Sequence, residues 1–233
     1  MAKKIAVIGI GNFGSHLATT LAAQGAEVLA IDSSMERLED IKDKVTYTVR
    51  LDSTEEKALR EQAITEFDVV IVAIGDDFEA TLLTVAALQN IGVQRIIARA
   101  TTQTHERILR HLGISEVISP AVEAAERLAD SLMYRGVIDS LELSSEYSIV
   151  EVSAPPSFVG KTLAELNLRE NFDVNLITIK RIEQEPRLLG LRSRTIEKIM
   201  GIPTPDMVVQ KNDILVLFAK KPAINKMCNG SAD

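Results

Sequence analysis

The sequence predicts an α/β protein in which a doubly wound parallel sheet is followed by a long helix and a smaller α+β domain. Three observations lead to this prediction. Short apolar segments alternate with amphipathic segments over the first half of the chain, the first apolar segment ends in a glycine-rich turn, and the alternation stops at Pro120. Strands that are each separated by a helix pair in parallel, through right-handed crossovers.

Strands of this sheet are predicted over residues 5–9, 27–31, 45–51, 68–74, 94–99 and 116–118. The first of them is uniformly apolar, as expected where both faces of a strand are buried. Helices are predicted over residues 13–24, 78–90 and 104–111, over a segment carrying Met35, Leu38 and Ile41, and over one carrying Ala58, Leu59 and Gln62. Gly25 can end the first helix. Asp32-Ser33 and Ser53 or Thr54 can cap the helices that follow them.

The pattern changes after Pro120. Residues 120–135 predict one long amphipathic helix, with Val122, Leu128 and Leu132 on its apolar stripe and Gly136 at its end. Strands are then predicted over residues 138–143, 147–152, 174–180 and 213–219, and a short helix over 162–167. We therefore expect a domain over residues 1–138 that includes the long helix, a smaller domain over 139–222, and a tail over 223–233.

Composition excludes several classes of function. The formal net charge is −7, which argues against a nucleic-acid binder. The single cysteine, Cys228, excludes disulfide scaffolds and cysteine-ligated metal centres within one chain. No apolar run has the length of a membrane-spanning helix, and the first residues lack a secretion signal.

A glycine-rich motif carries the clearest chemical signal. Gly9, Gly11 and Gly14 fit the pattern G-x-G-x-x-G, placed after a strand and opening a helix, as in Rossmann-like folds. The first glycine permits the tight turn, the second lets a phosphate approach the backbone, and the third lets helix and strand pack closely. Asp32 ends the second strand, where a carboxylate can accept both ribose hydroxyls of a nucleotide.

Other strand ends lead to the same crevice. Asp52 and Ser53 follow the third strand, where helix capping and adenosine contact are both open. Arg99 ends the fifth strand and either neutralises a phosphate or forms an ion pair with Asp52 or Asp76. The complete set of candidate cofactor-binding residues is Gly9, Gly11, Asn12, Phe13, Gly14, Asp32, Ser33, Arg37, Asp52, Ser53, Ile74, Gly75 and Arg99.

Catalytic groups are scarce. The three histidines, His16, His105 and His111, all precede the second domain, where a dehydrogenase would be expected to place a substrate-handling group. No nucleophile or metal-ligand spacing stands out. A nucleotide site without such groups indicates a sensor, and a small NAD(P)-dependent oxidoreductase and a nucleotide-bound structural adaptor are the alternatives.

Several segments together resemble one family. They are residues 6–14 (AVIGIGNFG), 30–32, 69–75, the helix from Pro120, and residues 145–151, 160–166 and 210–216, the last with Asn212 where glycine is common. Over roughly residues 3–221 the chain resembles the RCK family, and is most similar to the cytosolic regulatory subunits of Trk/Ktr-type potassium-uptake systems.

The resemblance implies a mechanism and partners. The N-terminal domain would bind ATP, ADP or NAD(H), with phosphates and ribose at Gly11, Asn12, Phe13, Asp32 and Arg99. The long helix would cross over to pair subunits. Rings of eight would dock, at the inner face of the cell membrane, on a membrane-embedded potassium-translocating subunit. Ligand-dependent change of the ring would gate that partner.

The chain departs from the family pattern at three places. Asn12 replaces an arginine that often reaches a neighbour's γ-phosphate, and Ala121 replaces a glutamate that holds a divalent cation in some members, so no metal residue is assigned. Residues 184–202 insert a basic, apolar stretch, for which a local helix packed on its own domain and a contact with an anionic effector or membrane partner are both considered. In some relatives the second domain binds cyclic di-AMP. Arg169 and Asn175 lie in that area, but the sequence does not decide the effector.

Overall fold

The computed structural model describes residues 2–133, 136–144, 146–185 and 194–229. It divides into two compact units, residues 1–122 and 123–233. The division falls inside the long helix, whereas the sequence-based boundary lies at residue 138. Most of that helix therefore belongs to the second unit.

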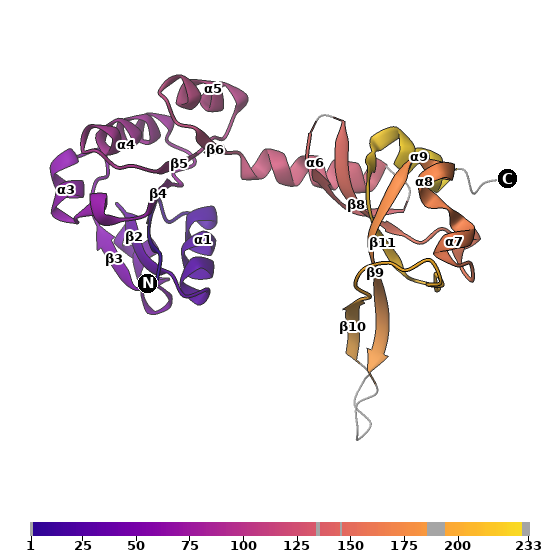
Figure 1. The fold of residues 1–233 in the computed structure, drawn as a ribbon. Coiled ribbons are helices and arrows are strands. Elements are labelled where there is room, and N and C mark those ends of the chain that lie inside the picture. The colour runs from indigo at the N-terminus through magenta and orange to yellow at the C-terminus, as the bar shows by residue number, and fades with distance from the viewer. Residues whose placement is uncertain (1, 134–135, 145, 186–193, 230–233) are drawn as a thin grey trace. The chain divides into compact units, whose positions relative to one another are not determined.

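The first unit is built around a six-stranded parallel sheet with the order β3-β2-β1-β4-β5-β6 (Figure 1). Its strands are β1 (Lys4–Ile8), β2 (Glu27–Asp32), β3 (Tyr47–Arg50), β4 (Val69–Val72), β5 (Ile96–Arg99) and β6 (Glu116–Ile118). The helices between them are α1 (Asn12–Ala23), α2 (Met35–Glu39), α3 (Glu56–Glu61), α4 (Phe78–Asn90) and α5 (Gln103–His111). The expected doubly wound architecture is confirmed, and its order reverses between β1 and β4, where such sheets bind ligands.

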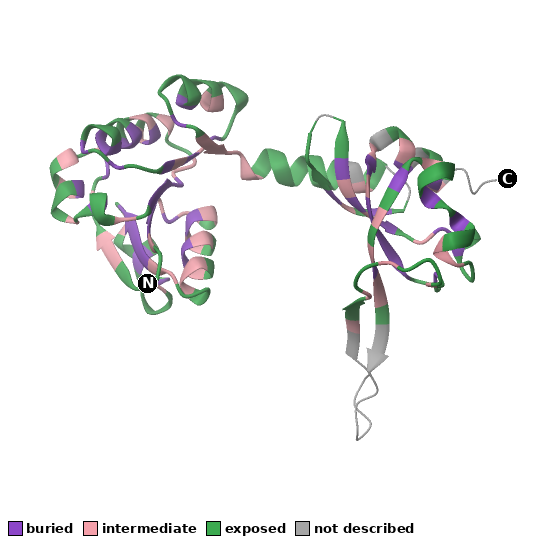
Figure 2. Ribbon diagram, viewed as in Figure 1, coloured by how far each residue is buried: buried purple, intermediate pink, exposed green. Residues whose placement is uncertain are grey.

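The central strands β1, β2 and β4 are buried almost throughout, which suits their largely apolar residues, whereas the edge strands β3 and β6 are only partly buried (Figure 2). Ile8, Ile31 and Val72 belong to one core cluster, together with Leu59 of α3 and Leu88 of α4. Their neighbours along the strands, among them Val7 and Ala30, belong to a second cluster with residues of α1 and α2. Alternate residues of each strand therefore anchor helices on opposite sides.

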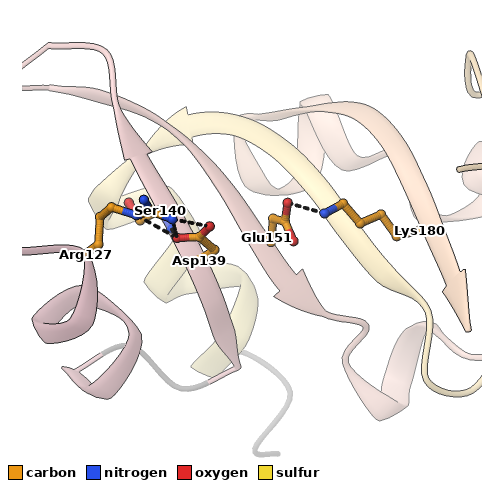
Figure 3. Close-up of polar contacts among 5 residues, drawn as sticks. All are labelled: Arg127, Asp139, Ser140, Glu151 and Lys180. Atoms are coloured by element: carbon orange, nitrogen blue, oxygen red, sulfur yellow. Dashed lines mark hydrogen bonds and ion pairs between the residues drawn. The ribbon is translucent and has the colours of Figure 1, made fainter. Parts of the chain in front are cut away.

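Helix α6 (Pro120–Met133) follows β6. Its side chains from Ala121 to Ala129 are exposed, including the apolar stripe. Leu128 is 60% exposed and Leu132 76%. In the second unit, Arg127 of this helix forms an ion pair with Asp139 of the first strand that follows (Figure 3). Across the described residues of the chain, none of the helices has the length and apolar character needed to cross a membrane.

The second unit contains a five-stranded antiparallel sheet with the order β10-β9-β11-β8-β7. Its elements are β7 (Val137–Glu142), β8 (Tyr147–Ser153), α7 (Leu163–Leu166), α8 (Leu168–Phe172), β9 (Val174–Glu185), β10 (Arg194–Ile199), β11 (Ile214–Lys220) and α9 (Lys221–Asn229). Val152, Ile179 and Leu215 form the centre of one buried cluster. Buried Asp213 accepts hydrogen bonds from Arg181, which ties β9 to the turn before β11.

Two expectations for this unit are wrong. The local helix considered within residues 184–202 is replaced, over 194–199, by strand β10, which pairs with β9; residues 186–193 lie outside the described chain. The segment 223–233 is not only a tail, because residues 221–229 form α9. Ile224 and Met227 of this helix are buried in the cluster of the second unit.

Candidate nucleotide-binding site

A cleft of about 480 Å³ lies at the carboxyl ends of the parallel strands. Of the candidate residues predicted from the sequence, all except Gly14 line it. The cleft is also lined by Ile8, Leu51, Thr54, Ala73, Asp76, Asp77 and Ala80, which are not among the candidates predicted from the sequence. Asp77 could have been found from the sequence, because it stands directly before a predicted helix, where aspartate is a common N-cap. In the structure its carboxylate accepts a hydrogen bond from the Ala80 N–H and caps α4.

The glycine motif has the geometry that its spacing predicts. Gly9 has a φ of +92°, which favours glycine. A Cβ built on Gly14 would lie 1.9 Å from the carbonyl oxygen of Gly9, so helix and strand can approach this closely only without a side chain. Around Gly11, by contrast, a Cβ would meet nothing within 4 Å. Gly11 precedes α1, and no side chain caps that end of the helix. The first turn of α1 therefore presents a positive helix end to the cleft.

Asp32 fastens the glycine turn to the end of β2. Its Oδ2 accepts a hydrogen bond from the Ile10 N–H at 2.6 Å, and its Oδ1 accepts one from the Ser34 N–H at 2.8 Å. The residue preceding α2 is Ser34, so the expectation that Asp32-Ser33 caps this helix is wrong. Arg37 Nη1 lies 3.6 Å from Asp32 Oδ2. Each carboxylate oxygen retains a further lone pair for a ribose hydroxyl.

Asp52 and Ser53 form a second polar edge of the cleft. Asp52 Oδ1 accepts hydrogen bonds from the Thr54 N–H at 3.0 Å and the Thr54 hydroxyl at 2.7 Å. These bonds, led by the one from the backbone, lower the pKa of Asp52 and keep it ionised. The buried Ser53 hydroxyl lies 2.8 Å from the Thr84 hydroxyl of α4. Helix α3 follows Glu55, so neither Ser53 nor Thr54 caps it.

Two arginines, Arg37 and Arg99, are among the described residues that line the cleft, and Arg99 lies at the end of β5. Within the described residues it forms no ion pair with Asp52 or Asp76, so that alternative is not realised. Its Cζ lies 5.5 Å from the centroid of the Phe13 ring, within the range of a cation–π contact. Its Nε is buried and has no hydrogen-bond partner. A buried N–H without a partner lowers the stability of the fold, and an anionic ligand that accepted a hydrogen bond from this guanidinium would offset that cost.

The histidines stand apart from this cleft. His105 stacks on Phe78, with ring centroids 3.7 Å apart, and its Nδ1 lies 2.8 Å from the Thr101 hydroxyl. His111 Nδ1 lies 2.7 Å from the carbonyl oxygen of Arg107. His16 does not line the cleft but a neighbouring cavity of about 470 Å³, which shares Gly11, Asn12, Arg37 and Asp76 with it. Among the described residues, no group of three or more His, Cys, Asp or Glu side chains is arranged to hold a metal ion.

The chain matches two domain families. Residues 5–120 match the TrkA-N domain and residues 147–229 the TrkA-C domain. Among curated proteins, the Ktr system potassium uptake protein C of Bacillus subtilis is 31% identical over 226 residues, which cover 97% of this chain and 96% of that protein. The Ktr system potassium uptake protein A of the same organism is 30% identical, over 97% of this chain and 96% of that protein.

Solved structures share the fold. The GsuK RCK domain has a TM-score of 0.66 at 16% identity and covers 100% of this chain and 48% of that one. The GsuK channel bound to NAD has a TM-score of 0.65 at 16% identity, over 98% of this chain and 39% of that one. With both domain matches and near-complete coverage of these relatives, the chain belongs to the RCK family of Ktr and Trk potassium uptake proteins, which carry TrkA-N and TrkA-C domains.

Proposed function

We propose that the protein is a nucleotide-sensing regulatory subunit of a potassium-uptake system. An adenine nucleotide, ATP, ADP or NAD(H), binds in the cleft at the carboxyl ends of the strands. The observation that carries this proposal is the convergence of an uncapped helix N-terminus, the carboxylate of Asp32 and the unneutralised guanidinium of Arg99 on one cleft. These groups match phosphate and ribose. The NAD-bound GsuK channel, which shares the fold, supports this ligand class.

Sensing, rather than chemistry, fits the composition of the cleft. Its described lining includes no His, Lys, Tyr or Cys. An NAD(P)-dependent oxidoreductase needs a proton donor and acceptor beside the nicotinamide, and these residue types usually supply it. The acidic side chains of the described lining are all aspartates, and three of them, Asp32, Asp52 and Asp77, already accept hydrogen bonds from backbone amides. We therefore favour a ligand that is bound and not transformed.

The partner is a membrane-embedded potassium-translocating subunit. The names of the Ktr and Trk relatives support this partner. Self-association through α6 provides the means of transmission, since Leu128 and Leu132 are too exposed for a helix that remains in water. Dimers joined along α6 assemble into an octameric ring at the inner face of the membrane, and exchange of nucleotides shifts the ring between two shapes.

The decisive experiment identifies the nucleotide that copurifies with the protein by mass spectrometry, then measures the affinities of ATP, ADP, NAD and NADH by calorimetry. We expect at least one of them to bind, and potassium flux through the reconstituted partner to depend on which is bound. Protein that binds none of these ligands contradicts the proposal. Steady oxidation of NADH with a small carbonyl substrate supports the oxidoreductase instead.

A further inference from the structure

Gly75 occupies a position that does not require glycine for backbone reasons. It follows β4 and precedes α4 in the wall of the cleft. Its φ is not among the positive values of the chain, so a residue with a side chain could adopt the same backbone. The backbone of the turn therefore does not explain why this position lacks a Cβ, and the reason must lie in the atoms around it.

The space of the missing side chain is filled by the guanidinium of Arg99. A Cβ built on Gly75 would lie 2.8 Å from Arg99 Nη1, 3.3 Å from Cζ and 3.6 Å from Nη2. No Cβ normally tolerates the first of these distances. Because the contacting atoms are the far end of a flexible side chain, an alanine at this position would displace the guanidinium and leave the backbone in place.

The guanidinium is held on a second side by Phe13, whose ring centroid lies 5.5 Å from Arg99 Cζ. Three carboxylates that line the same cleft, those of Asp52, Asp76 and Asp77, make no ion pair with Arg99 in the described chain. Asp52 and Asp77 instead accept hydrogen bonds from the Thr54 and Ala80 amides. The position of Arg99 is thus set by packing against Gly75 and Phe13, and its charge remains available.

We propose that Gly75 is a positioning residue for phosphate recognition: it forms the notch that holds the Arg99 guanidinium against Phe13, aimed at the phosphates of a nucleotide. The proposal rests on the proposed function and deepens it. It assigns the selection of phosphorylated ligands over the bare nucleoside to the pair Gly75–Arg99, whereas Asp32, at the other end of the cleft, recognises the ribose that all these ligands share.

The test compares adenosine, AMP and ADP as ligands of the wild-type protein, Gly75→Ala, Arg99→Gln and the double variant, by calorimetry. In Gly75→Ala we expect the preference for ADP over adenosine to fall about ten- to a hundred-fold, the loss of one charge-assisted hydrogen bond. In Arg99→Gln the preference for ADP should fall as far, and in the double variant it should fall no further than in either single variant. Arg60→Gln, which removes an exposed arginine of α3 that does not line the cleft, serves as the control for the loss of one positive charge and should keep the wild-type preference.

The outcomes separate the two levels of the argument. If the wild type binds none of the three ligands, the proposed function and this inference both fail. If the wild type prefers ADP and Gly75→Ala retains that preference, or if the effects of Gly75→Ala and Arg99→Gln add, the inference alone is overturned. Should Gly75→Ala fail to fold, Phe13→Leu removes the ring from the opposite side of the guanidinium. An undiminished preference for ADP in Phe13→Leu likewise refutes the arrangement.

Discussion

Arg127 of α6 donates hydrogen bonds to Asp139 of β7 from two of its nitrogens. Nε donates to Oδ1 at 3.1 Å, and Nη2 donates to Oδ1 at 2.9 Å and to Oδ2 at 2.8 Å (Figure 3). A neighbouring pair, Lys180 with Glu151, lies on the same sheet (Figure 3). The bidentate contact fastens the C-terminal half of α6 to the sheet of the second unit. The chain divides inside this helix, after residue 122, and Arg127 lies on the side of the second unit.

The Arg127–Asp139 contact predicts that breaking the pair loosens α6 and β7, and that exchanging the two charges restores them. Arg127→Gln should increase hydrogen exchange of the backbone amides in α6 and β7, measured by mass spectrometry, because the helix loses its polar attachment. The exchanged pair Arg127→Asp with Asp139→Arg should restore protection. Arg110→Gln, which breaks a similarly exposed pair in α5, is the control. Unchanged exchange in Arg127→Gln would show that this ion pair does not hold the helix against the sheet.

The same pair predicts a pH dependence. The hydrogen bonds from Arg127 hold the pKa of Asp139 below its ordinary value of 3.8. A carboxyl whose pKa is lowered by folding stabilises the protein above its unfolded pKa, and this contribution is lost as the pH falls through the folded value. The stability difference between the wild type and Asp139→Asn should therefore persist at neutral pH and shrink below about pH 3.8. Chemical denaturation at several pH values measures it; a difference that grows on acidification would contradict the assignment.

Asp32→Ala should weaken nucleotide binding because ribose loses its charged acceptor, and each such hydrogen bond contributes about 1.5–3 kcal/mol. The variant should also lower the melting temperature, since the amides of Ile10 and Ser34 lose their partner. Asp32→Asn keeps one acceptor oxygen and should be intermediate in both. Calorimetry and thermal unfolding separate the two effects. Unaltered affinity in Asp32→Ala would exclude a role in ribose recognition.

Gly11→Val should abolish binding of phosphorylated ligands with little change in the fold. A Cβ built on Gly11 has no other atom within 4 Å, and the φ of −77° suits any residue. The valine side chain would therefore fit the fold and occupy the space that we assign to the phosphates. Circular dichroism checks the fold and calorimetry the affinity. Gly11→Ala offers a graded comparison, with a smaller loss expected. Retained binding in the valine variant would place the phosphates elsewhere.

Leu128→Asp together with Leu132→Asp should dissociate the assembly, because both side chains would be buried where two copies of α6 meet. Light scattering coupled to size-exclusion chromatography should show a smaller particle at the same protein concentration. Leu83 of α4 is likewise exposed, to 50%, and Leu83→Asp should leave the mass of the particle unaltered. A particle of unchanged mass in the double variant would locate the contact between subunits elsewhere.

The sequence predicted the first unit well because its central strands β1, β2 and β4 are buried and largely apolar, and the glycine motif directly follows one of them. It could not predict β10. Ile196 and Ile199 are three residues apart, a spacing that suits one face of a helix, and only the pairing of Glu197 with Ile182 across the sheet reveals a strand. The sequence predicts a tail in place of α9 for a similar reason, since the burial of Ile224 and Met227 depends on their packing in the cluster of the second unit.

In the site, sequence and topology together led to the strand ends, because parallel strands deliver their carboxyl ends to one edge. The choice between a phosphate contact and an ion pair for Arg99 depends on distances between side chains that are remote in the sequence. The interaction of Arg99 with Phe13 and the notch at Gly75 became visible only in three dimensions.

The two amide bonds to Asp32 have a thermodynamic consequence. They hold the glycine turn in place without a ligand, so under the proposed function the end of the cleft that takes the adenosine of a nucleotide is preorganised and costs little entropy to occupy. Ligands that share this end then gain nearly the same free energy from it. Any difference in the response to them must arise where their remaining atoms differ, beyond the ribose.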